Sequence, residues 1–274
     1  MRNCRICGQT LPKSSILSLE KMPLTDDFIP VSAQDKKEFL ADISIFQCSG
    51  CGLIQNPCDF DVGSYYLDYE YSSACSNFTK KFMDVFAATT IQAYEKVNQK
   101  RPQKILEIGS GDGEQLEAYS RLGIEVLGVE PSASLAEIAN KRGVQTMVSL
   151  FDSDTPIGRM EFDICLASYT FDHVLDPVNY LQAANSALRK NGILAIEIHD
   201  LRLTIERAEF CLFEHEHTIY MSESGLSNLI ESCGFDVLSI NPIDSVAVRG
   251  NSLIVIARKM VEIDVDRSSL QRLE

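Results

Sequence analysis

Beyond residue 100, short apolar runs alternate with stretches in which apolar residues recur every three or four positions. The apolar runs predict strands at residues 104–108, 124–130, 162–170, 192–200, 235–243 and 252–259. Helical patterns lie between most of them, and this alternation is typical of an α/β fold with a doubly wound, mostly parallel sheet. No helical pattern separates the last two runs, so we expect the final strand to be antiparallel.

The chain before this alternation has a different character. A helix is predicted at residues 76–98, followed by the polar hinge "NQKRPQK", and two C-x-x-C pairs precede it. We therefore expect an N-terminal module at residues 1–75, an α/β domain at residues 76–260 and a tail at residues 261–274 that is a frayed end or a short helix.

The two C-x-x-C pairs predict a structural zinc site. Each pair is followed by a glycine that lets the backbone fold back toward the sulfurs, and four thiolates complete a tetrahedral zinc shell. Such a site is closed to substrate, so the metal would hold structure rather than perform chemistry. The predicted ligands are Cys4, Cys7, Cys48 and Cys51.

Composition restricts the class of partner. The chain has 274 residues, of which 45% are hydrophobic and 23% charged, and a formal net charge of −14. That charge argues against a nucleic-acid partner, because phosphate binding needs a basic surface. Neither a signal peptide nor an apolar run of membrane-spanning length is evident, so we expect a cytoplasmic protein without a membrane partner. The oligomeric state stays open.

The loop after residue 108 determines the expected ligand. Its glycines are spaced G-x-G-x-G, and Glu114 occupies the place of the third glycine of a dinucleotide loop. Glu107 lies two residues before the loop and Asp112 lies within it. These carboxylates would repel a pyrophosphate but suit a cation, and S-adenosylmethionine carries a sulfonium and an ammonium without a phosphate.

The remaining cofactor candidates follow the ends of successive strands. Glu130, in "GVEPS", is placed to accept hydrogen bonds from both ribose hydroxyls, and Phe151 and Asp152 could flank adenine, although Phe151 could equally belong to the core. A turn with an acidic N-cap is the alternative interpretation of the glycine loop. The full predicted cofactor set is Glu107, Gly109, Ser110, Gly111, Gly113, Glu130, Pro131, Ser132, Phe151, Asp152, Ser168 and Tyr169.

Several motifs together resemble the zinc-containing sugar methyltransferases, which include nucleotide-sugar C-methyltransferases. The motifs are the two C-x-x-C pairs, "MPLTDDFI", "GLIQ", "YYLDYEYSSACS", "LEIGSGDG", "GVEPS", "FDHV" and "EHEHTIYMS", within residues 1–258. The resemblance implies a class I methyltransferase domain covered by a lid of zinc module and tyrosine segment. It also implies that Tyr69 and Tyr71 face the cleft, and that a histidine in the Y-x-E-H-like segment transfers a proton.

Two departures from this family leave the substrate open. The C-methylating members continue into a third domain, whereas this chain stops soon after "VIARK", and Glu214 stands where the family has a tyrosine. The predicted function is methyl transfer to carbon or oxygen of a small molecule, with a nucleotide-linked sugar as substrate. The alternatives are O-methylation of another small metabolite and a non-catalytic zinc protein with a methyltransferase-like domain.

The segment "CLFEHEHTIYMS" at residues 211–222 carries two of the four histidines. If it is extended, His215 and His217 share one face, and the sequence places no third ligand nearby. Because a catalytic metal needs at least three protein ligands, the sequence favours proton transfer. The resemblance points to His217 as the base, with Glu214 or Glu216 positioning it or the substrate, and His173 is the alternative base.

Overall fold

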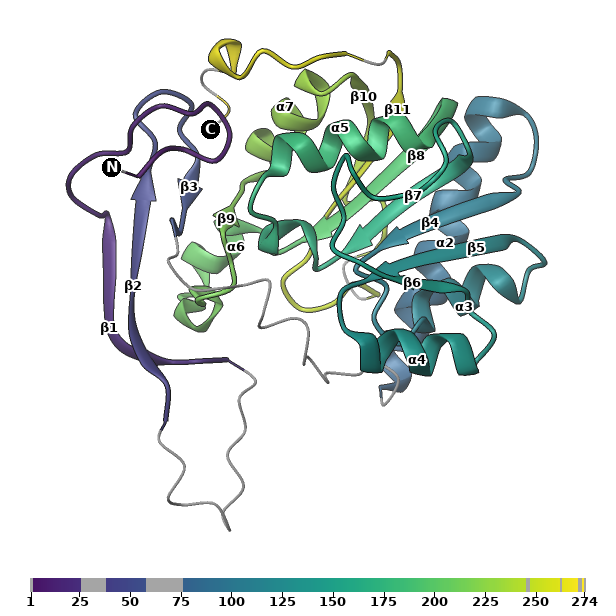
Figure 1. Ribbon diagram of the computed structural model, residues 1–274, viewed down its shortest axis with the longest axis horizontal. Coiled ribbons are helices and arrows are strands. Elements are labelled where there is room, and N and C mark those ends of the chain that lie inside the picture. The colour runs from purple at the N-terminus through teal and green to yellow at the C-terminus, as the bar shows by residue number, and fades with distance from the viewer. Residues whose placement is uncertain are drawn as a thin grey trace.

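A computed structural model describes residues 2–25, 38–57, 76–244, 247–261, 263–270 and 273. Its main sheet has seven strands in the order β10-β11-β8-β7-β4-β5-β6 (Figure 1). The strands are β4 (Lys104–Ile108), β5 (Glu125–Glu130), β6 (Thr146–Val148), β7 (Phe162–Ser168), β8 (Leu188–Ile198), β10 (Phe235–Ile240) and β11 (Leu253–Lys259). All run parallel except β11, which is antiparallel to both of its neighbours. The predicted fold class, including the antiparallel last strand, is confirmed.

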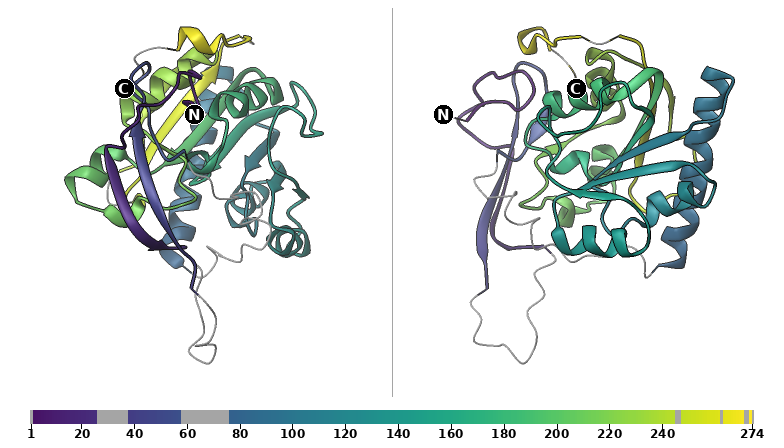
Figure 2. Two further views of the ribbon diagram at one scale, coloured as in Figure 1. Left: turned by 60° about the vertical axis from the view of Figure 1, so that its left-hand side comes forward. Right: turned by 45° about the vertical axis from the view of Figure 1, so that its right-hand side comes forward.

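Helices cover both faces of this sheet because its strands are apolar on both sides. Successive residues of one strand alternate between two cores, so Ile105 packs on one face and Leu106 on the other. The helices are α2 (Asn77–Asn98), α3 (Glu114–Ser120), α4 (Ala133–Lys141), α5 (Pro177–Ala187), α6 (Leu201–Glu206) and α7 (Glu223–Ser232). Residues of α2, α3 and α4 join one core, and residues of α5 and α7 join the other. Helix α2 lies on the far side of the sheet from the N-terminal module (Figure 2).

The strand order reverses beside β4. This strand pairs with β5 on one side and with β7 on the other, so the chain crosses to opposite faces from this point. The loops after β4 and β7 therefore diverge and leave a crevice at the carboxyl ends of the strands. In open α/β sheets this crevice is where ligands bind.

A second sheet joins the N-terminal module to the α/β domain. It contains β1 (Leu17–Pro23), β2 (Leu40–Gln47), β3 (Ile54–Gln55) and β9 (Ile219–Tyr220), in that order. All of its pairings are antiparallel, and β9 comes from the α/β domain. This sheet lies beside the main sheet and does not continue it (Figures 1 and 2). The segment that carries His217 is thus held by the module through the adjoining β9.

The C-terminal tail returns to the module. Its short 3-10 helix η5 (Arg267–Ser269) is anchored by Arg267, which donates to both carboxylate oxygens of Asp176 at 2.6 Å and to the carbonyl of Arg5 at 3.1 Å. The Leu273 amide donates to the Cys51 carbonyl at 2.8 Å. The expected short helix is therefore present, and the tail links the module to α5. None of the described helices is long and apolar enough to cross a membrane.

Candidate active site and zinc module

The four predicted cysteine ligands converge in the N-terminal module. The Cys4 and Cys51 sulfurs are 3.5 Å apart, the Cys7 and Cys48 sulfurs are 3.6 Å apart, and all four lie within 4.8 Å of one another. Thiolates bound to one tetrahedral zinc are about 3.8 Å apart, so the spacing fits this ion. A hydrogen bond from Cys51 lowers the pKa of the Cys4 thiol to about 4, whereas the same contact raises the pKa of Cys51 and burial raises that of Cys7. A bound cation would be needed to hold all four as thiolates. The site is closed by its four cysteines.

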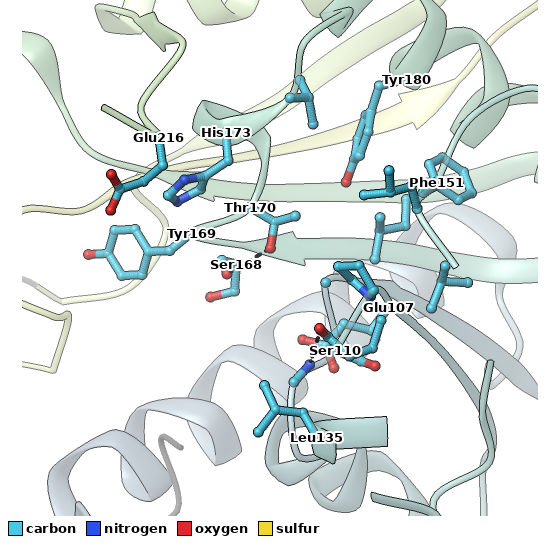
Figure 3. A pocket seen from close by; sticks show the side chains of 18 of the residues that line it. Glu107, Ser110, Leu135, Phe151, Ser168, Tyr169, Thr170, His173, Tyr180 and Glu216 are labelled. Atoms are coloured by element: carbon cyan, nitrogen blue, oxygen red, sulfur yellow. Dashed lines mark hydrogen bonds between the residues drawn. The ribbon is translucent and has the colours of Figure 1, made fainter. Parts of the chain in front are cut away.

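A large cavity occupies the crevice at the carboxyl ends of the main strands. Its volume of about 800 Å³ is in the range of sites that enclose a cofactor together with a substrate. The loops after β4, β5, β6, β7 and β8 line it, together with residues of the segment before β9. Figure 3 shows Glu107 and Ser110 at one end and His173 and Glu216 at the other. The cavity therefore joins the glycine loop to the histidines.

The glycine loop has the open backbone that a ligand requires. Gly109, Gly111 and Gly113 all have positive φ, at 71°, 52° and 80°. A Cβ at Gly109 would come within 2.3 Å of Thr170 Oγ1, whereas one at Gly111 would meet nothing within 4 Å and would project into open space. Gly109 is thus needed for packing, and Gly111 leaves room for the ligand's close approach.

Two buried carboxylates flank this loop. Glu130 accepts hydrogen bonds from the amides of Gly111 and Ser132, each at 2.8 Å, so it fixes the loop as well as facing the cavity. Glu107 is only 3% exposed, and among the described residues its Oε2 has no hydrogen-bond partner. Burial raises the pKa of Glu107 well above its usual range; Arg249 opposes this shift, and Glu130 and Asp112 add to it. A bound cation would offset this accumulation of negative charge.

Apart from Gly113, which is the N-cap of α3, and Ser132, the other predicted cofactor residues also line the cavity, but some are engaged elsewhere. Phe151 packs edge-on against Tyr180, with ring centroids 5.2 Å apart, and Asp152 accepts a hydrogen bond from the Asp154 amide at 2.9 Å. Tyr169 donates to the Asn251 carbonyl at 2.6 Å. Pro131 and Ser168 complete the predicted residues along the wall, whereas Ser132 is the buried N-cap of α4 and does not line it.

At the other end of the cavity, three imidazoles gather around one carboxylate. Asp172 Oδ2 is 2.8 Å from His199 Nδ1, and Asp172 Oδ1 is 3.6 Å from His173 Nε2. The His217 ring centroid lies 4.6 Å from that of His173 and 5.1 Å from that of His199. His217 Nδ1 is 2.8 Å from the Leu212 carbonyl and must donate to it, so Nε2 is unprotonated in the neutral ring. Burial, with repulsion from His173, lowers the pKa of His217 to about 3.

The segment before β9 is bent, which corrects one expectation. Because of a bend at residues 215–216, His215 and His217 do not share a face. His215 packs edge-on against Phe39 of the N-terminal module, while His217, Glu214 and Glu216 line the cavity. Glu214 Oε2 lies 3.4 Å from His217 Nε2.

The sequence alone places no third metal ligand near His217, but the fold brings further ligand atoms to it. Asp172, His173 and His217 each bring a ligand atom within 4.8 Å of the others. Sequence reasoning missed Asp172 and His199 as site residues, because residues far apart in the chain meet only through the sheet. The available signal was position, since β7 and β8 are adjacent parallel strands: His199 directly follows β8, and Asp172 lies four residues after the end of β7.

Arg249 is a third residue that the sequence did not single out. Its guanidinium lies over the Phe82 and Tyr169 rings, 4.6 and 4.4 Å from their centroids, and it bonds to the buried carboxylate of Glu197. It also lines the cavity. The predicted lid residues Tyr69 and Tyr71 lie outside the described residues.

Comparison with known families agrees with this geometry. Residues 80–240 match the family model described as "Methyltransferase domain", and residues 4–66 match "Putative zinc binding domain". The chain belongs to the methyltransferase-domain family. Its cofactor is S-adenosylmethionine, and the positive-φ loop at Gly111 and the unpaired Oε2 of buried Glu107 fit that cationic group. Zinc is the second predicted cofactor, and the four-cysteine cluster fits it.

Two curated relatives of this methyltransferase match different lengths of the chain. C-methyltransferase NovU of Streptomyces niveus is 26% identical over 266 residues, which are 93% of this chain and 60% of NovU. Ubiquinone biosynthesis O-methyltransferase of Nitrobacter winogradskyi is 33% identical over 96 residues, 34% of this chain and 37% of that protein. The methyltransferase therefore spans less than two thirds of the length of either relative.

Solved structures support the fold. The plantazolicin methyltransferase BpumL in complex with SAH is 16% identical, with a TM-score of 0.55 over 73% of this chain and 94% of its own. The PH0226 protein of Pyrococcus horikoshii is also 16% identical, with a TM-score of 0.54 over 72% of this chain and 98% of its own. These two likenesses show a common fold and nothing finer.

Proposed function

We propose that this methyltransferase transfers a methyl group to carbon or oxygen of a nucleotide-linked sugar. The observation that carries the proposal is the single cavity that joins the acidic glycine loop to a buried, unprotonated imidazole nitrogen of His217. NovU, which is named a C-methyltransferase and whose likeness covers 93% of the chain, supports methyl transfer to carbon. The nucleotide-linked sugar rests on the sequence motifs that resemble the zinc-containing sugar methyltransferases. Residues 1–75 would form the zinc module and lid, and residues 76–260 the catalytic domain.

The cofactor would lie along the loops after β4, β5 and β6. Bound S-adenosylmethionine supplies an electrophilic methyl group on a sulfonium. Gly111 leaves the backbone room for close approach. Glu107 would face the ammonium, and Glu130 would accept from the ribose with the lone pairs that the Gly111 and Ser132 amides leave free. Phe151 would contact the adenine ring, and Asp152 would face its polar edge.

The substrate's proton would leave at the histidine end. Methylation of a hydroxyl or of a carbon beside a carbonyl needs a base, and His217 presents Nε2 while its Nδ1–H is fixed by the Leu212 carbonyl. Glu214, 3.4 Å from Nε2, and Glu216 would position the imidazole or the sugar hydroxyls. His173 is the alternative base because it lines the same end of the cavity.

Substrate panels test this proposal directly. Purified enzyme with trideuteromethyl S-adenosylmethionine would be given nucleotide-linked keto sugars, nucleotide-linked hydroxy sugars and free quinols, and products would be read by mass spectrometry. We expect label only in nucleotide sugars. His217→Ala should lower turnover by about 10²–10⁴-fold, the usual loss on removal of a general base, with S-adenosylhomocysteine affinity unchanged.

His215→Ala is the matched control, since His215 lies in the same segment but faces the N-terminal module. Deuterium uptake by a keto sugar in heavy water, without cofactor, would show carbon deprotonation and separate C- from O-methylation. Labelling of quinols alone would contradict the sugar assignment. Cofactor binding without transfer to any acceptor class would favour a non-catalytic protein.

A further inference from the structure

The cluster at the histidine end of the cavity has the composition of a transition-metal site. We propose that Asp172, His173 and His217 bind a divalent first-row metal ion, separate from the cysteine-bound zinc, and that this ion holds the acceptor oxygen of the substrate. Two imidazoles and one carboxylate suit zinc, iron(II), cobalt(II) or manganese(II). The inference rests on the proposed methyl transfer and specifies how its acceptor is bound.

The three ligand atoms are close enough for one ion after a small adjustment. They lie within 4.8 Å of one another, and the Asp172 Oδ1 to His173 Nε2 distance is 3.6 Å. Nitrogen and oxygen ligands of one tetrahedral zinc are about 3.4 Å apart. The widest pair therefore has to close by about 1.4 Å at most, and rotation of the imidazoles can supply this movement.

The surrounding hydrogen bonds already hold the ligands as metal sites require. A ligating histidine normally donates its other ring N–H to a carbonyl or carboxylate, and a ligating carboxylate is itself hydrogen-bonded. His217 Nδ1 donates to the Leu212 carbonyl at 2.8 Å, which leaves Nε2 for the ion. His199 Nδ1 lies 2.8 Å from Asp172 Oδ2, which leaves Oδ1 for the ion.

The free oxygen of Asp172 is the independent sign that a ligand belongs here. Asp172 is 3% exposed, and its Oδ1 accepts no hydrogen bond from the described residues. His173 Nε2, 3.6 Å away, is beyond hydrogen-bond distance, so this buried oxygen has lost water without gaining a hydrogen bond in exchange. A cation bound to Oδ1 would satisfy this atom.

Three protein ligands leave a coordination position open, as in catalytic metal sites. His173 and His217 both line the cavity, so that position faces the substrate space. An ion there would lower the pKa of a substrate hydroxyl bound to it. The hydroxyl proton would pass to the carboxylate of Glu214, whose Oε2 lies 3.4 Å from His217 Nε2. In the loaded site His217 is a ligand, whereas in a metal-free site the same nitrogen is the general base.

Metal analysis of the whole chain tests the inference without using activity. Protein would be stripped with chelator, reloaded with cobalt(II) or zinc(II) alone, freed of excess ion and measured by mass spectrometry. We expect about two ions per chain, one for each predicted site. Asp172→Asn and His217→Gln should each retain about one, Cys48→Ser should lose the other, and His215→Ala, as the matched control, should keep both.

Cobalt(II) absorption gives a second readout, because thiolate-bound and imidazole-bound ions have different spectra. We expect the His217→Gln variant to keep only the thiolate-type bands. Thermal unfolding would show that each variant is folded. Equal metal content in wild-type protein, Asp172→Asn and His217→Gln would overturn the inference. If the wild-type protein then binds one ion only but still transfers methyl groups, and His217→Ala loses this transfer, the proposed function stands with His217 as the base.

Discussion

Replacing Glu130 by alanine should weaken both the glycine loop and the cofactor site. The Glu130 side chain is 5% exposed, and its two oxygens accept from the Gly111 and Ser132 amides at 2.8 Å each. Hydrogen bonds to a charged group contribute about 1.5–3 kcal/mol each. Removing both should lower the free energy of unfolding by about 3 kcal/mol, the lower end of their sum, because water will reach the freed amides in the open cavity.

The loss of cofactor affinity comes in addition to this loop effect. The alanine removes the proposed acceptor for the ribose hydroxyls. It also removes the hydrogen bond that fixes the Gly111 amide, at the point where the cofactor would approach the backbone. We expect S-adenosylhomocysteine to bind at least tenfold more weakly, which corresponds to about 1.4 kcal/mol. Isothermal titration calorimetry measures the affinity, and urea unfolding measures the stability.

Glu125→Ala is the matched control for this prediction. Glu125 begins the same strand β5, but its side chain is 62% exposed and pairs with Lys104 at 2.9 Å on the surface. A surface pair of this kind contributes about 0–1 kcal/mol, so the control should bind cofactor like wild type. If Glu130→Ala bound S-adenosylhomocysteine with wild-type affinity, the ribose would not be held by Glu130, and the cofactor placement argued from the structure would be wrong.

Two further changes test the module and the acid response of the fold. Cys48→Ser removes a predicted zinc ligand, so it should reduce bound zinc and speed proteolysis of the N-terminal module. The tail docks on the same module through the hydrogen bond from the Leu273 amide to the Cys51 carbonyl, so it should loosen as well. Unchanged zinc content would refute this. Burial alone would raise the pKa of Asp163, but hydrogen bonds led by the Gln103 amide and Tyr94 lower it overall. Its contribution is therefore present above the unfolded-state pKa of about 3.9 and is lost as pH falls through the folded value. Asp163→Asn should be less stable at neutral pH and should lose less stability on acidification below about pH 4 than wild type; parallel stability curves would contradict this.

The main sheet could be predicted because each strand carries its own signal. The predicted strands at residues 104–108 and 252–259 appear as β4 (Lys104–Ile108) and β11 (Leu253–Lys259). Runs this apolar can be stable only when both faces are buried, which requires helices on each side. The antiparallel last strand followed from the missing crossover helix. Local pattern and connection length together were enough for the fold.

The small sheet could not be predicted in the same way. Strands β3 and β9 have two residues each, too few to show a period, and they pair across more than 160 positions of sequence as Ile54 with Tyr220 and Gln55 with Ile219. Their pairing depends on the module being brought to the α/β domain. No local pattern contains that information.

The two ends of the cavity differ in the same respect. The glycine loop is local, so its spacing and flanking carboxylates indicated the cofactor class directly. The histidine cluster is assembled from three separate segments, and His199, Asp172 and His217 meet only because β7 and β8 are adjacent and β9 returns beside them. Sequence reasoning judged the metal ligands incomplete because it could not see this convergence.

The central claim is that S-adenosylmethionine binds in the open space beside Gly111. Paired glycine variants test it most directly. Gly111 and Gly123 both have positive φ, at 52° and 77°, and a Cβ at either would meet nothing within 4 Å. Alanine should therefore strain the backbone similarly at both, by about 1–3 kcal/mol, but only Gly111 lines the cavity. Calorimetry should show that Gly123→Ala binds S-adenosylhomocysteine like wild type and that Gly111→Ala binds it at least tenfold more weakly, about 1.4 kcal/mol. Equal binding by the two variants would contradict the claim.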